Sequence, residues 1–371
     1  MIKAEKVCVI TSVHPHNDVR IFHKEAKSLI ENGYDVFVLC PDFEGTMENI
    51  VCIKMPIEHK KSKRILYSWK TAFNYAKNID ADIYHIHDPE LIKTGIKLKQ
   101  IGKKVIYDAH EDIGKQILSK SWINLSLRKI IAPIVEKYVI KNANSFDLTI
   151  CATEIIAEKF KNSITIHNYP DEEEIRNFYE DKKYNLRDNN ICYVGSISNQ
   201  RGTYEMVEAM SGIDGKLLLA GDFENLELEQ EVKSHKNYGK VEILGTLSRR
   251  QVWEVLNESR IGLLVLKNTS AYVESMPIKL FEYMMAGLPV IASDFKLWRE
   301  LVGTAGALFV DNQNIKEIKN AIKYLLENPD IAYEMGQAGK KIALKKYNFK
   351  VEREKLLSAY EKYVYVRIKE K

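Results

Sequence analysis

Short apolar runs alternate with amphipathic stretches along almost the whole chain. In the first half, the apolar runs predict buried strands and the stretches between them predict helices. The predicted strands cover 7–13, 36–40, 51–54, 83–87, 105–109 and 148–151. The predicted helices cover about 21–32, 67–78, 91–100 and 113–142. Because strands that alternate with helices are typical of parallel sheets, this half is predicted to be an α/β domain.

The second half repeats the alternation after a charge-dense stretch, 171–190, that has no apolar period and is predicted to be a linker. The predicted strands cover 191–195, 216–221, 241–245, 261–266, 289–293 and 307–310. The predicted helices cover 203–210, 227–234, 249–258, 278–286 and 315–326, and two more, 331–345 and 351–366, close the chain. A chain of 371 residues is too long for one ordinary core. We therefore predict two domains, 1–170 and 191–350.

The stretch 274–294 concentrates the candidate chemistry. It is Glu274-Ser-Met-Pro-Ile-Lys-Leu-Phe-Glu282, followed by Tyr-Met-Met-Ala-Gly-Leu-Pro-Val-Ile-Ala-Ser-Asp. Pro277 suits a first helical turn and Gly287 suits a helix end, so Glu274 lies just before a helix and Glu282 lies inside it. The start of a helix binds anions because its first N–H groups have no partners.

A diphosphate bound at this helix start would place a sugar near Glu274 and a ribose near Glu282. A carboxylate is a natural acceptor for hydrogen bonds from two adjacent sugar hydroxyls. The alternative is an ordinary solvated helix with two exposed glutamates. Glu282 fits that alternative poorly, because its neighbours Phe281 and Met285 are apolar and a charge among them needs a partner.

The seven-residue gap between the two glutamates, the proline three residues after the first, and the Ala-Gly-Leu-Pro-Val-Ile-Ala tail resemble the motif of a known family. This is family 4 of the retaining glycosyltransferases, of the bacterial surface-polysaccharide type. The resemblance implies an α/β, GT-B fold, with two Rossmann-like parallel-sheet domains that face each other across a cleft. It also implies that 1–170 takes the acceptor, that 191–350 binds the nucleotide sugar, and that the last helix, 351–371, packs back on the first domain.

The same resemblance gives a donor site. Its members usually carry a cation after the first glycine of the loop 194–202 and another before the second, and this chain has Ser196 and Arg201 there. One guanidinium still offers a two-pronged contact with phosphate. The predicted donor-binding residues are Gly195, Ser196, Arg201, Gly221, Thr246, Leu247, Glu274, Ser275, Met276, Pro277 and Glu282.

Candidate residues of the first domain follow its predicted strands, because ligands of parallel sheets bind beyond the carboxyl ends of strands. His110 matches the family's histidine near the donor sugar, so the predicted catalytic set is His110, Glu274 and Arg201. The predicted acceptor-side residues are Asp18, Arg20, His87 and Asp88. Asp18 is equally suited to cap the following helix.

No metal is predicted in the first domain. We expect only one of His85 and His87 to reach a given pocket, and no third ligand for zinc is evident.

The resemblance therefore implies a retaining transfer of a hexosyl or N-acetylhexosaminyl group, with no metal and no cofactor. The expected donor is a UDP-sugar, and the expected acceptor is a glycan, lipid-linked in polysaccharide biosynthesis. One alternative is a GT-B nucleotide-sugar 2-epimerase. Another is a non-catalytic GT-B partner subunit, which would be expected to lose some of His110, Arg201, Glu274 and Glu282. A nicotinamide dinucleotide has little support, since no G-x-G-x-x-G follows the first strand.

Composition narrows the partners and the compartment. The net charge of +4 is too small to indicate nucleic acid. The five cysteines lie in apolar runs without metal-binding spacing, as expected for buried thiols in a reducing compartment. With no membrane-spanning run and no signal peptide, the expected location is the cytoplasm.

Basic and apolar residues are interleaved in 113–142, which predicts peripheral docking at the inner face of the cell membrane. The cations are Lys115, Lys120, Arg128, Lys129, Lys137 and Lys141, and the apolar residues between them include Trp122, Ile123, Leu125, Leu127, Ile130 and Ile131. A second basic run, 60–64, precedes Tyr67 and Trp69. The alternative is that Ile130, Ile131, Ile134 and Val135 form the core face of this helix.

Overall fold

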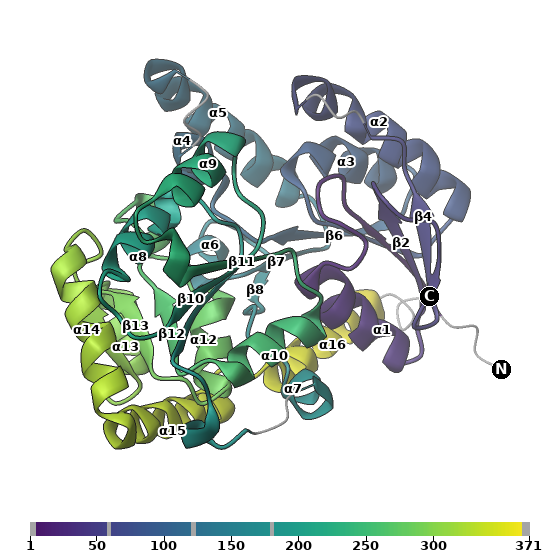
Figure 1. Ribbon diagram of the computed structural model, residues 1–371. Coiled ribbons are helices and arrows are strands. Elements are labelled where there is room, and N and C mark those ends of the chain that lie inside the picture. The colour runs from purple at the N-terminus through teal and green to yellow at the C-terminus, as the bar shows by residue number, and fades with distance from the viewer. Residues whose placement is uncertain (1–4, 58–60, 120–123, 179–181, 366–371) are drawn as a thin grey trace. The chain divides into compact units, whose positions relative to one another are not determined.

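The computed structural model describes residues 5–57, 61–119, 124–178 and 182–365. The chain forms two compact units (Figure 1). The first unit contains residues 1–168 and 349–371, and the second contains residues 169–348.

The first unit is built on an eight-stranded sheet with the order β3-β4-β2-β1-β5-β6-β7-β8. The strands are β1 (Lys6–Ile10), β2 (Asp35–Cys40), β3 (Gly45–Met47), β4 (Ile50–Lys54), β5 (Ile83–Ile86), β6 (Lys104–Ala109), β7 (Leu148–Cys151) and β8 (Ser163–Thr165). All neighbours are parallel except β3, which pairs antiparallel with β4. The α/β prediction is confirmed, and the two strands missing from it, β3 and β8, have three residues each.

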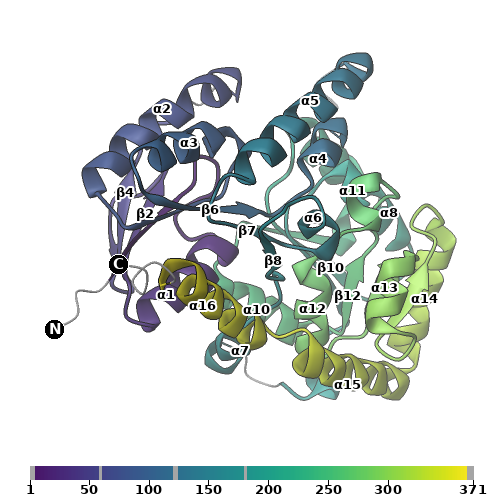
Figure 2. The ribbon, with the colours of Figure 1, turned by 180° about the vertical axis from the view of Figure 1, so that it is seen from behind.

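Helices cover both faces of this sheet (Figures 1 and 2). One core joins it to η1 (Val19–Ala26), α1 (Lys27–Glu31) and α16 (Phe349–Tyr365). The other core joins it to α2 (Lys61–Ile79), η2 (Pro89–Leu91), α3 (Ile92–Gln100), α5 (Leu125–Ala143) and α6 (Glu154–Ala157). Successive strand residues such as Val7 and Cys8 enter opposite cores, because side chains alternate across a strand.

The prediction of one continuous helix over 113–142 is wrong. The structure has two helices, α4 (Ile113–Ser119) and α5, and they pack against each other. Residues 120–123 lie outside the described residues, so nothing is assigned to Lys120, Trp122 or Ile123. Lys60 lies outside them as well.

The second unit has a six-stranded parallel sheet with the order β11-β10-β9-β12-β13-β14. Its strands are β9 (Asn190–Val194), β10 (Lys216–Ala220), β11 (Val241–Gly245), β12 (Ile261–Leu264), β13 (Val290–Ser293) and β14 (Ala307–Val310). Its helices are α7 (Glu172–Phe178), η3 (Tyr184–Leu186), η4 (Asn199–Arg201), α8 (Thr203–Ala209), α9 (Leu226–Ser234), η5 (Tyr238–Lys240), α10 (Arg249–Glu258), α11 (Ser270–Val273), α12 (Ile278–Met285), α13 (Lys296–Val302), α14 (Ile315–Glu327) and α15 (Pro329–Lys346).

The segment 171–190, predicted to be a linker, is part of the second unit. It contains α7, which packs against α10, and η3, whose Tyr184 is buried in the core of this unit. Three glutamates at the start of α7 stabilise it as a helix, because they face the positive end of its dipole. Their charge also made the segment resemble a linker, since it hid Ile175, the buried position of α7.

Candidate functional site

Three glycines end adjacent strands of the second unit and leave bare backbone at the carboxyl edge of its sheet. Gly195, Gly221 and Gly245 follow or end β9, β10 and β11 and have φ angles of 122°, 144° and 66°. The Gly195 N–H donates to Ala220 O and the Gly221 N–H donates to Gly245 O, each at 2.7 Å. A Cβ on Gly221 would lie only 2.2 Å from the Gly195 carbonyl oxygen, so only glycine allows this close approach.

The predicted loop residues lie around Gly195. Ser196 is exposed and uncharged, whereas Arg201 is half-buried at the end of η4. Its Nη1 atom lies 3.5 Å from the Tyr193 hydroxyl and would lie 3.4 Å from a Cβ on Gly195. The structure therefore brings Gly195, Gly221 and Arg201 together, with Thr246 and Leu247 next in the chain after Gly245.

Lys279, which the sequence did not single out, also reaches this loop. It lies in the first turn of α12, and a Cβ on Gly195 would be 2.5 Å from its Nζ atom. Its ammonium lies 5.2 Å from the centroid of the Tyr193 ring. Burial, together with the positive charge of Arg201, lowers the pKa of Lys279 to about 7.

The predicted residues Glu274 to Pro277 lie just before the start of α12, the predicted anion-binding helix. Glu274 is exposed and ends α11, and Pro277 is the residue just before α12. No side chain caps the first N–H groups of α12. Ser275 is fixed by two hydrogen bonds, from its own hydroxyl to Tyr272 O at 2.9 Å and from Trp298 Nε1 to Ser275 O at 2.8 Å. Met276 beside it is half-buried.

Glu282 has the partner that a buried charge requires, although the sequence did not identify it. The carboxylate is 2% exposed, and its Oε1 accepts a hydrogen bond from Arg249 Nη2 at 2.5 Å. Arg249 also holds Glu174 of α7 through two hydrogen bonds of 2.6 and 2.8 Å. Because Glu174, Arg249 and Glu282 are far apart in sequence, only the fold brings them together.

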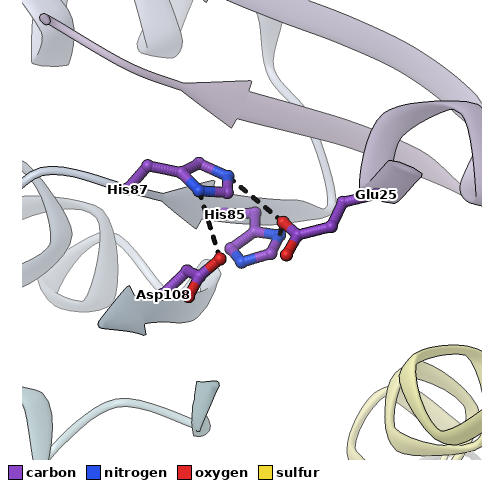
Figure 3. A group of neighbouring side chains, drawn as sticks. All are labelled: Glu25, His85, His87 and Asp108. Carbon is purple, nitrogen blue, oxygen red and sulfur yellow. Dashed lines mark ion pairs between the residues drawn. The ribbon is translucent and has the colours of Figure 1, made fainter. Parts of the chain in front are cut away.

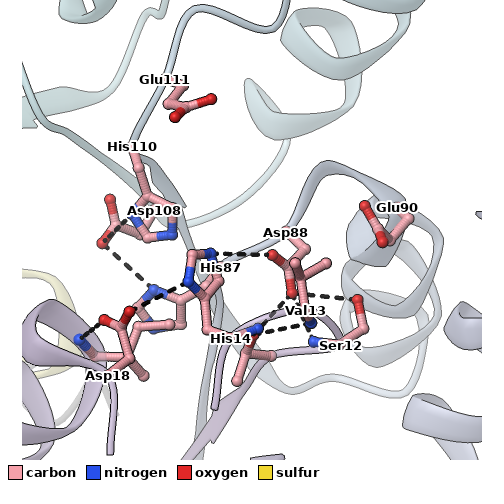
Figure 4. A network of polar contacts seen from close by, with 12 residues as sticks. Ser12, Val13, His14, Asp18, His87, Asp88, Glu90, Asp108, His110 and Glu111 are labelled. Carbon is pink, nitrogen blue, oxygen red and sulfur yellow. Dashed lines mark hydrogen bonds and ion pairs between the residues drawn. The ribbon is translucent and has the colours of Figure 1, made fainter. Parts of the chain in front are cut away.

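The first unit contains a cavity of about 650 Å³ beyond the carboxyl ends of β1, β5 and β6. All the predicted residues of this domain line it, namely Asp18, Arg20, His87, Asp88 and His110. Figure 4 shows how the side chains of Asp18, His87, Asp88 and His110 gather between the strand ends. This volume is within the range of small-molecule sites.

Asp18 and His14 form a charged pair at the cavity wall. Asp18 caps η1, accepting hydrogen bonds from the Arg20 and Ile21 N–H groups at 2.9 and 3.0 Å, so its role as a cap is observed. Its Oδ2 atom lies 3.2 Å from His14 Nδ1. Although burial opposes the charge, Asp18 and Asp88 raise the pKa of His14 to about 9. The imidazole of His14 is therefore a cation at neutral pH.

Asp88 is held rigidly at the cavity floor. It accepts hydrogen bonds from the Thr11 hydroxyl at 2.9 Å and the Ser12 N–H at 2.6 Å. Its other oxygen lies 3.6 Å from His14 Nε2. The carboxylate thus joins the loop after β1 to the end of β5, and it can present an acceptor oxygen to a bound hydroxyl.

His110 lies between the cavity and the core of the first unit. Its Nδ1 atom is 3.4 Å from Asp108 Oδ2, and its ring stacks on that of His87 with centroids 5.3 Å apart. The ring of His14 meets it edge-on, also at 5.3 Å. The orientation of His110 is thus set by three neighbours.

Beneath the cavity lies a fully buried cluster of Glu25, His85, His87 and Asp108 (Figure 3). The expectation that only one of the two histidines reaches a given pocket is wrong, since their rings are 4.3 Å apart. Residues two apart on a strand share a face, which is why both point into this cluster. Glu25 and Asp108 are the further possible metal ligands that were not evident in the sequence. They were missed because they come from other elements of the fold.

The positive charge of Arg20 balances the negative charge of this cluster, so charge balance does not require a metal ion. Its guanidinium holds Asp108 through two hydrogen bonds of 2.8 and 3.0 Å, and its Nε lies 3.0 Å from Glu25 Oε1. Burial and the charge of Asp108 raise the pKa of Glu25 well above its ordinary range, which favours its protonated form. Arg20 and His110 overcome the effect of burial on Asp108 and hold its pKa well below its ordinary value. Burial lowers the pKa of both His85 and His87, so these rings are neutral.

Each half of the chain matches a known family of glycosyltransferases. Residues 19–168 match the family described as Glycosyltransferase Family 4, and residues 171–342 match the Glycosyl transferases group 1. A curated relative, the uncharacterised glycosyltransferase MJ1178 of Methanocaldococcus jannaschii, is 26% identical over 216 residues. The match covers 56% of this chain and 57% of that relative.

Solved structures show the same fold over nearly the whole chain. The sucrose-phosphate synthase of Thermosynechococcus elongatus has a TM-score of 0.76 at 16% identity, covering 96% of this chain and 98% of its own. HepE of Anabaena, crystallised with UDP-glucose, has a TM-score of 0.72 at 14% identity, covering 96% and 99%. A glycosyltransferase of Rickettsia africae has a TM-score of 0.69 at 17% identity, covering 97% and 99%. The fold is thus that of GT-B enzymes, with two Rossmann-like parallel-sheet domains.

Proposed function

Because this chain carries glycosyltransferase domains in both halves, we propose that it is a retaining glycosyltransferase. It moves a sugar from a nucleotide-diphosphate sugar to a glycan acceptor. The observation that carries the proposal is the arrangement around Gly195. There, bare backbone at the sheet edge meets Arg201 and the uncapped first turn of α12, which together suit a diphosphate.

The reaction follows from what each residue offers. The bond between the sugar's anomeric carbon and the diphosphate oxygen breaks, and a bond from that carbon to an acceptor hydroxyl oxygen forms on the same face. The acceptor proton passes to the departing diphosphate. Arg201 and the start of α12 stabilise the charge that develops on the diphosphate, and Glu274 holds the hydroxyls of the donor sugar.

The acceptor occupies the cavity of the first unit. Its lining includes the carboxylates of Asp88, Glu90 and Glu111, which can accept hydrogen bonds from sugar hydroxyls. Trp69 and Tyr138 line it too and offer flat surfaces for a sugar ring. A cavity with both carboxylates and aromatic rings suits a glycan better than it suits a purely apolar ligand.

The acceptor is proposed to be lipid-linked, as in the synthesis of bacterial surface polysaccharides. An apolar stripe runs along α5 and consists of Leu127, Ile130, Ile131, Ile134 and Tyr138. These side chains are 37–63% exposed, so Ile130, Ile131 and Ile134 are not the core face of this helix. Ile131 and Tyr138 of the stripe also line the cavity, as do Ile65 and Leu66 of α2.

Basic residues accompany these apolar side chains, as at a membrane interface. Lys129, Lys137 and Lys141 are exposed on α5, and Lys63 is exposed on α2. Within the described parts of the chain, every helix is too short or too polar to pass through a bilayer. Docking is therefore proposed through the α5 stripe and its lysines, with the lipid tail of the acceptor lying between α2 and α5.

Vesicle binding tests this docking. The protein is expected to co-sediment with anionic vesicles, less with neutral ones, and less again in high salt. Replacing Ile130 and Ile134 by serine should weaken binding at least about tenfold, because burying each isoleucine contributes roughly 1.5–3 kcal/mol. Leu226→Ser is the matched control, since Leu226 is 74% exposed in the second unit. Equal pelleting with both lipids, or with neither, would favour a soluble acceptor.

The role of Glu282 is tested by nucleotide binding. If its carboxylate holds the ribose, Glu282→Ala should weaken binding of the preferred nucleotide at least about tenfold, the effect of losing charge-assisted hydrogen bonds. Calorimetry with UDP, GDP and dTDP measures this affinity. Glu174→Ala is the control, because it removes the other carboxylate on Arg249 and should leave affinity intact. Equal losses in both variants would assign Glu282 to holding Arg249 only.

The function itself is tested with a panel of nucleotide sugars. Hydrolysis or transfer of one sugar with retention of configuration is expected, with a UDP-sugar as the expected donor and a hexosyl or N-acetylhexosaminyl group transferred. Conversion of a UDP-sugar to its 2-epimer without transfer would establish the epimerase. No turnover and no nucleotide binding would instead favour a partner subunit.

A further inference from the structure

Two cations from different elements of the second unit converge on one glycine. Arg201 comes from the loop after β9, and Lys279 comes from the first turn of α12. A Cβ on Gly195 would lie 2.5 Å from Lys279 Nζ and 3.4 Å from Arg201 Nη1. Both therefore occupy the side of Gly195 that a side chain at this position would otherwise fill.

Among the residues that the structure describes, no carboxylate forms an ion pair with Lys279 or Arg201. The acid whose charge acts on Lys279 is Glu282, and its oxygen is engaged by Arg249 of α10. Two phenols also lie beside the cations: the Tyr193 ring of β9 lies under Lys279, and Tyr272 of α11 bonds Arg201. Ser196, next to Gly195, contributes no charge. In the described part of the second unit, the two cations thus face each other without an anion between them, which is costly for half-buried groups.

We propose that Lys279 is the second cation of the diphosphate site, and that it gains its proton when the nucleotide binds. The inference rests on the proposed function, because it assumes that a nucleotide diphosphate binds at Gly195. In that position the guanidinium of Arg201 contacts the phosphate oxygens with two N–H groups, and the ammonium of Lys279 adds a point charge. A diphosphate between the two cations removes their repulsion and favours the ammonium form.

The consequence is a linkage between binding and protonation. Lys279 has a pKa of about 7 in the free protein, so much of it is neutral at pH 8. The bound anion raises that pKa, and the complex therefore holds more protons than the free protein. Binding must then weaken as the pH rises above 7, by up to about tenfold per pH unit when one full proton is taken up.

Calorimetry with UDP at pH 8, in buffers of different ionisation enthalpy, measures the protons taken up. The wild-type protein is expected to take up close to one proton per UDP. Lys279→Arg should keep affinity within a few fold but take up almost none, because a guanidinium is always charged. Lys279→Met should weaken UDP binding at least tenfold and take up no proton. Any change in the protonation of UDP itself is the same for all three proteins. The differences in proton uptake between them therefore come from residue 279.

A rescue variant separates loss of charge from loss of structure. Ser196→Arg in the Lys279→Met background restores a cation beside Gly195, at a position that is exposed. It should recover most of the UDP affinity without recovering proton uptake. Uridine, which lacks phosphate, should bind all variants alike.

Two results would overturn the inference in distinguishable ways. If Lys279→Met binds UDP as tightly as the wild type and with the same proton uptake, Lys279 is not part of the site, and the proposed transfer stands. If the wild-type protein binds none of UDP, GDP and dTDP, the proposed function fails together with the inference.

Discussion

Alanine at position 274 or at position 110 is expected to lower kcat by about 10²-fold or more, the scale of losing one group that stabilises a transition state. Glu274 is exposed just before the start of α12, where it is proposed to hold the donor sugar. His110 lines the cavity of the first unit, with its ring fixed by His14, His87 and Asp108. Neither residue is assigned to the diphosphate, so UDP affinity should stay within about threefold.

Steady-state kinetics with the donor found in the sugar panel, and calorimetry with UDP, separate the two effects. Glu300→Ala is the matched control for Glu274, because Glu300 is an exposed glutamate on α13 with only a long contact, 3.9 Å, to Lys296. Near-normal kcat in both Glu274→Ala and His110→Ala would place the active centre elsewhere. A fall in UDP affinity equal to the fall in kcat would assign these residues to nucleotide binding.

Replacing Arg20 by methionine is expected to destabilise the first unit by about 3–5 kcal/mol, because it leaves a buried carboxylate without its cation. In the wild type, Asp108 is ionised and fully buried against this guanidinium. Arg20 also donates to the Ile166 carbonyl at 2.9 Å, so the change removes a hydrogen bond between η1 and the loop after β8. Hydrogen exchange of the β5 and β6 peptides in urea measures the stability of this unit separately.

The pH dependence of stability shows whether the buried carboxylate of Asp108 causes the loss of stability in Arg20→Met. In the wild type, the lowered pKa of Asp108 gives stability that is present above its unfolded pKa and is lost as the pH falls through the folded one. In Arg20→Met the largest opposition to the burial of Asp108 is lost, its pKa rises, and the variant should gain stability as the pH falls. Lys27→Met, which removes a half-exposed ion pair of 3.0 Å with Glu48, should cost less than about 1 kcal/mol. A similar loss in both variants would contradict the assignment.

The strand pattern could be predicted from the sequence because buried parallel strands are nearly continuous apolar runs. Val36–Cys40 and Val290–Ser293 are of this kind, and both lie in interior strands with a neighbour on each side. β3 and β8 have only three residues and are partly exposed, which leaves no such run to detect. The break between α4 and α5 also escaped prediction, because apolar and basic residues continue through it.

The candidate sites could be predicted where one segment carries them or where their residues follow the ends of predicted strands. Glu274 and Glu282 stand out because both lie in one motif. Lys279 lies between them, but only its approach to Gly195, from 84 positions away along the chain, distinguishes it from a surface lysine. Arg249, the partner of Glu282, and Arg20, the partner of Asp108, likewise come from distant segments. A single sequence shows that a buried charge needs a partner but does not show which residue supplies it.

The return of α16 to the first unit has a consequence for biosynthesis. Phe349, Leu356 and Tyr360 belong to the same core as Val7 and Val9, and the Tyr360 hydroxyl lies 2.8 Å from His85 Nδ1 in the buried cluster. The second unit, 169–348, is complete in sequence before this helix is made. On the ribosome the second unit can therefore fold first, while the first unit, although synthesised earlier, waits for the last helix to close its core. A separately expressed first unit would need α16 fused to residue 168 in order to be soluble.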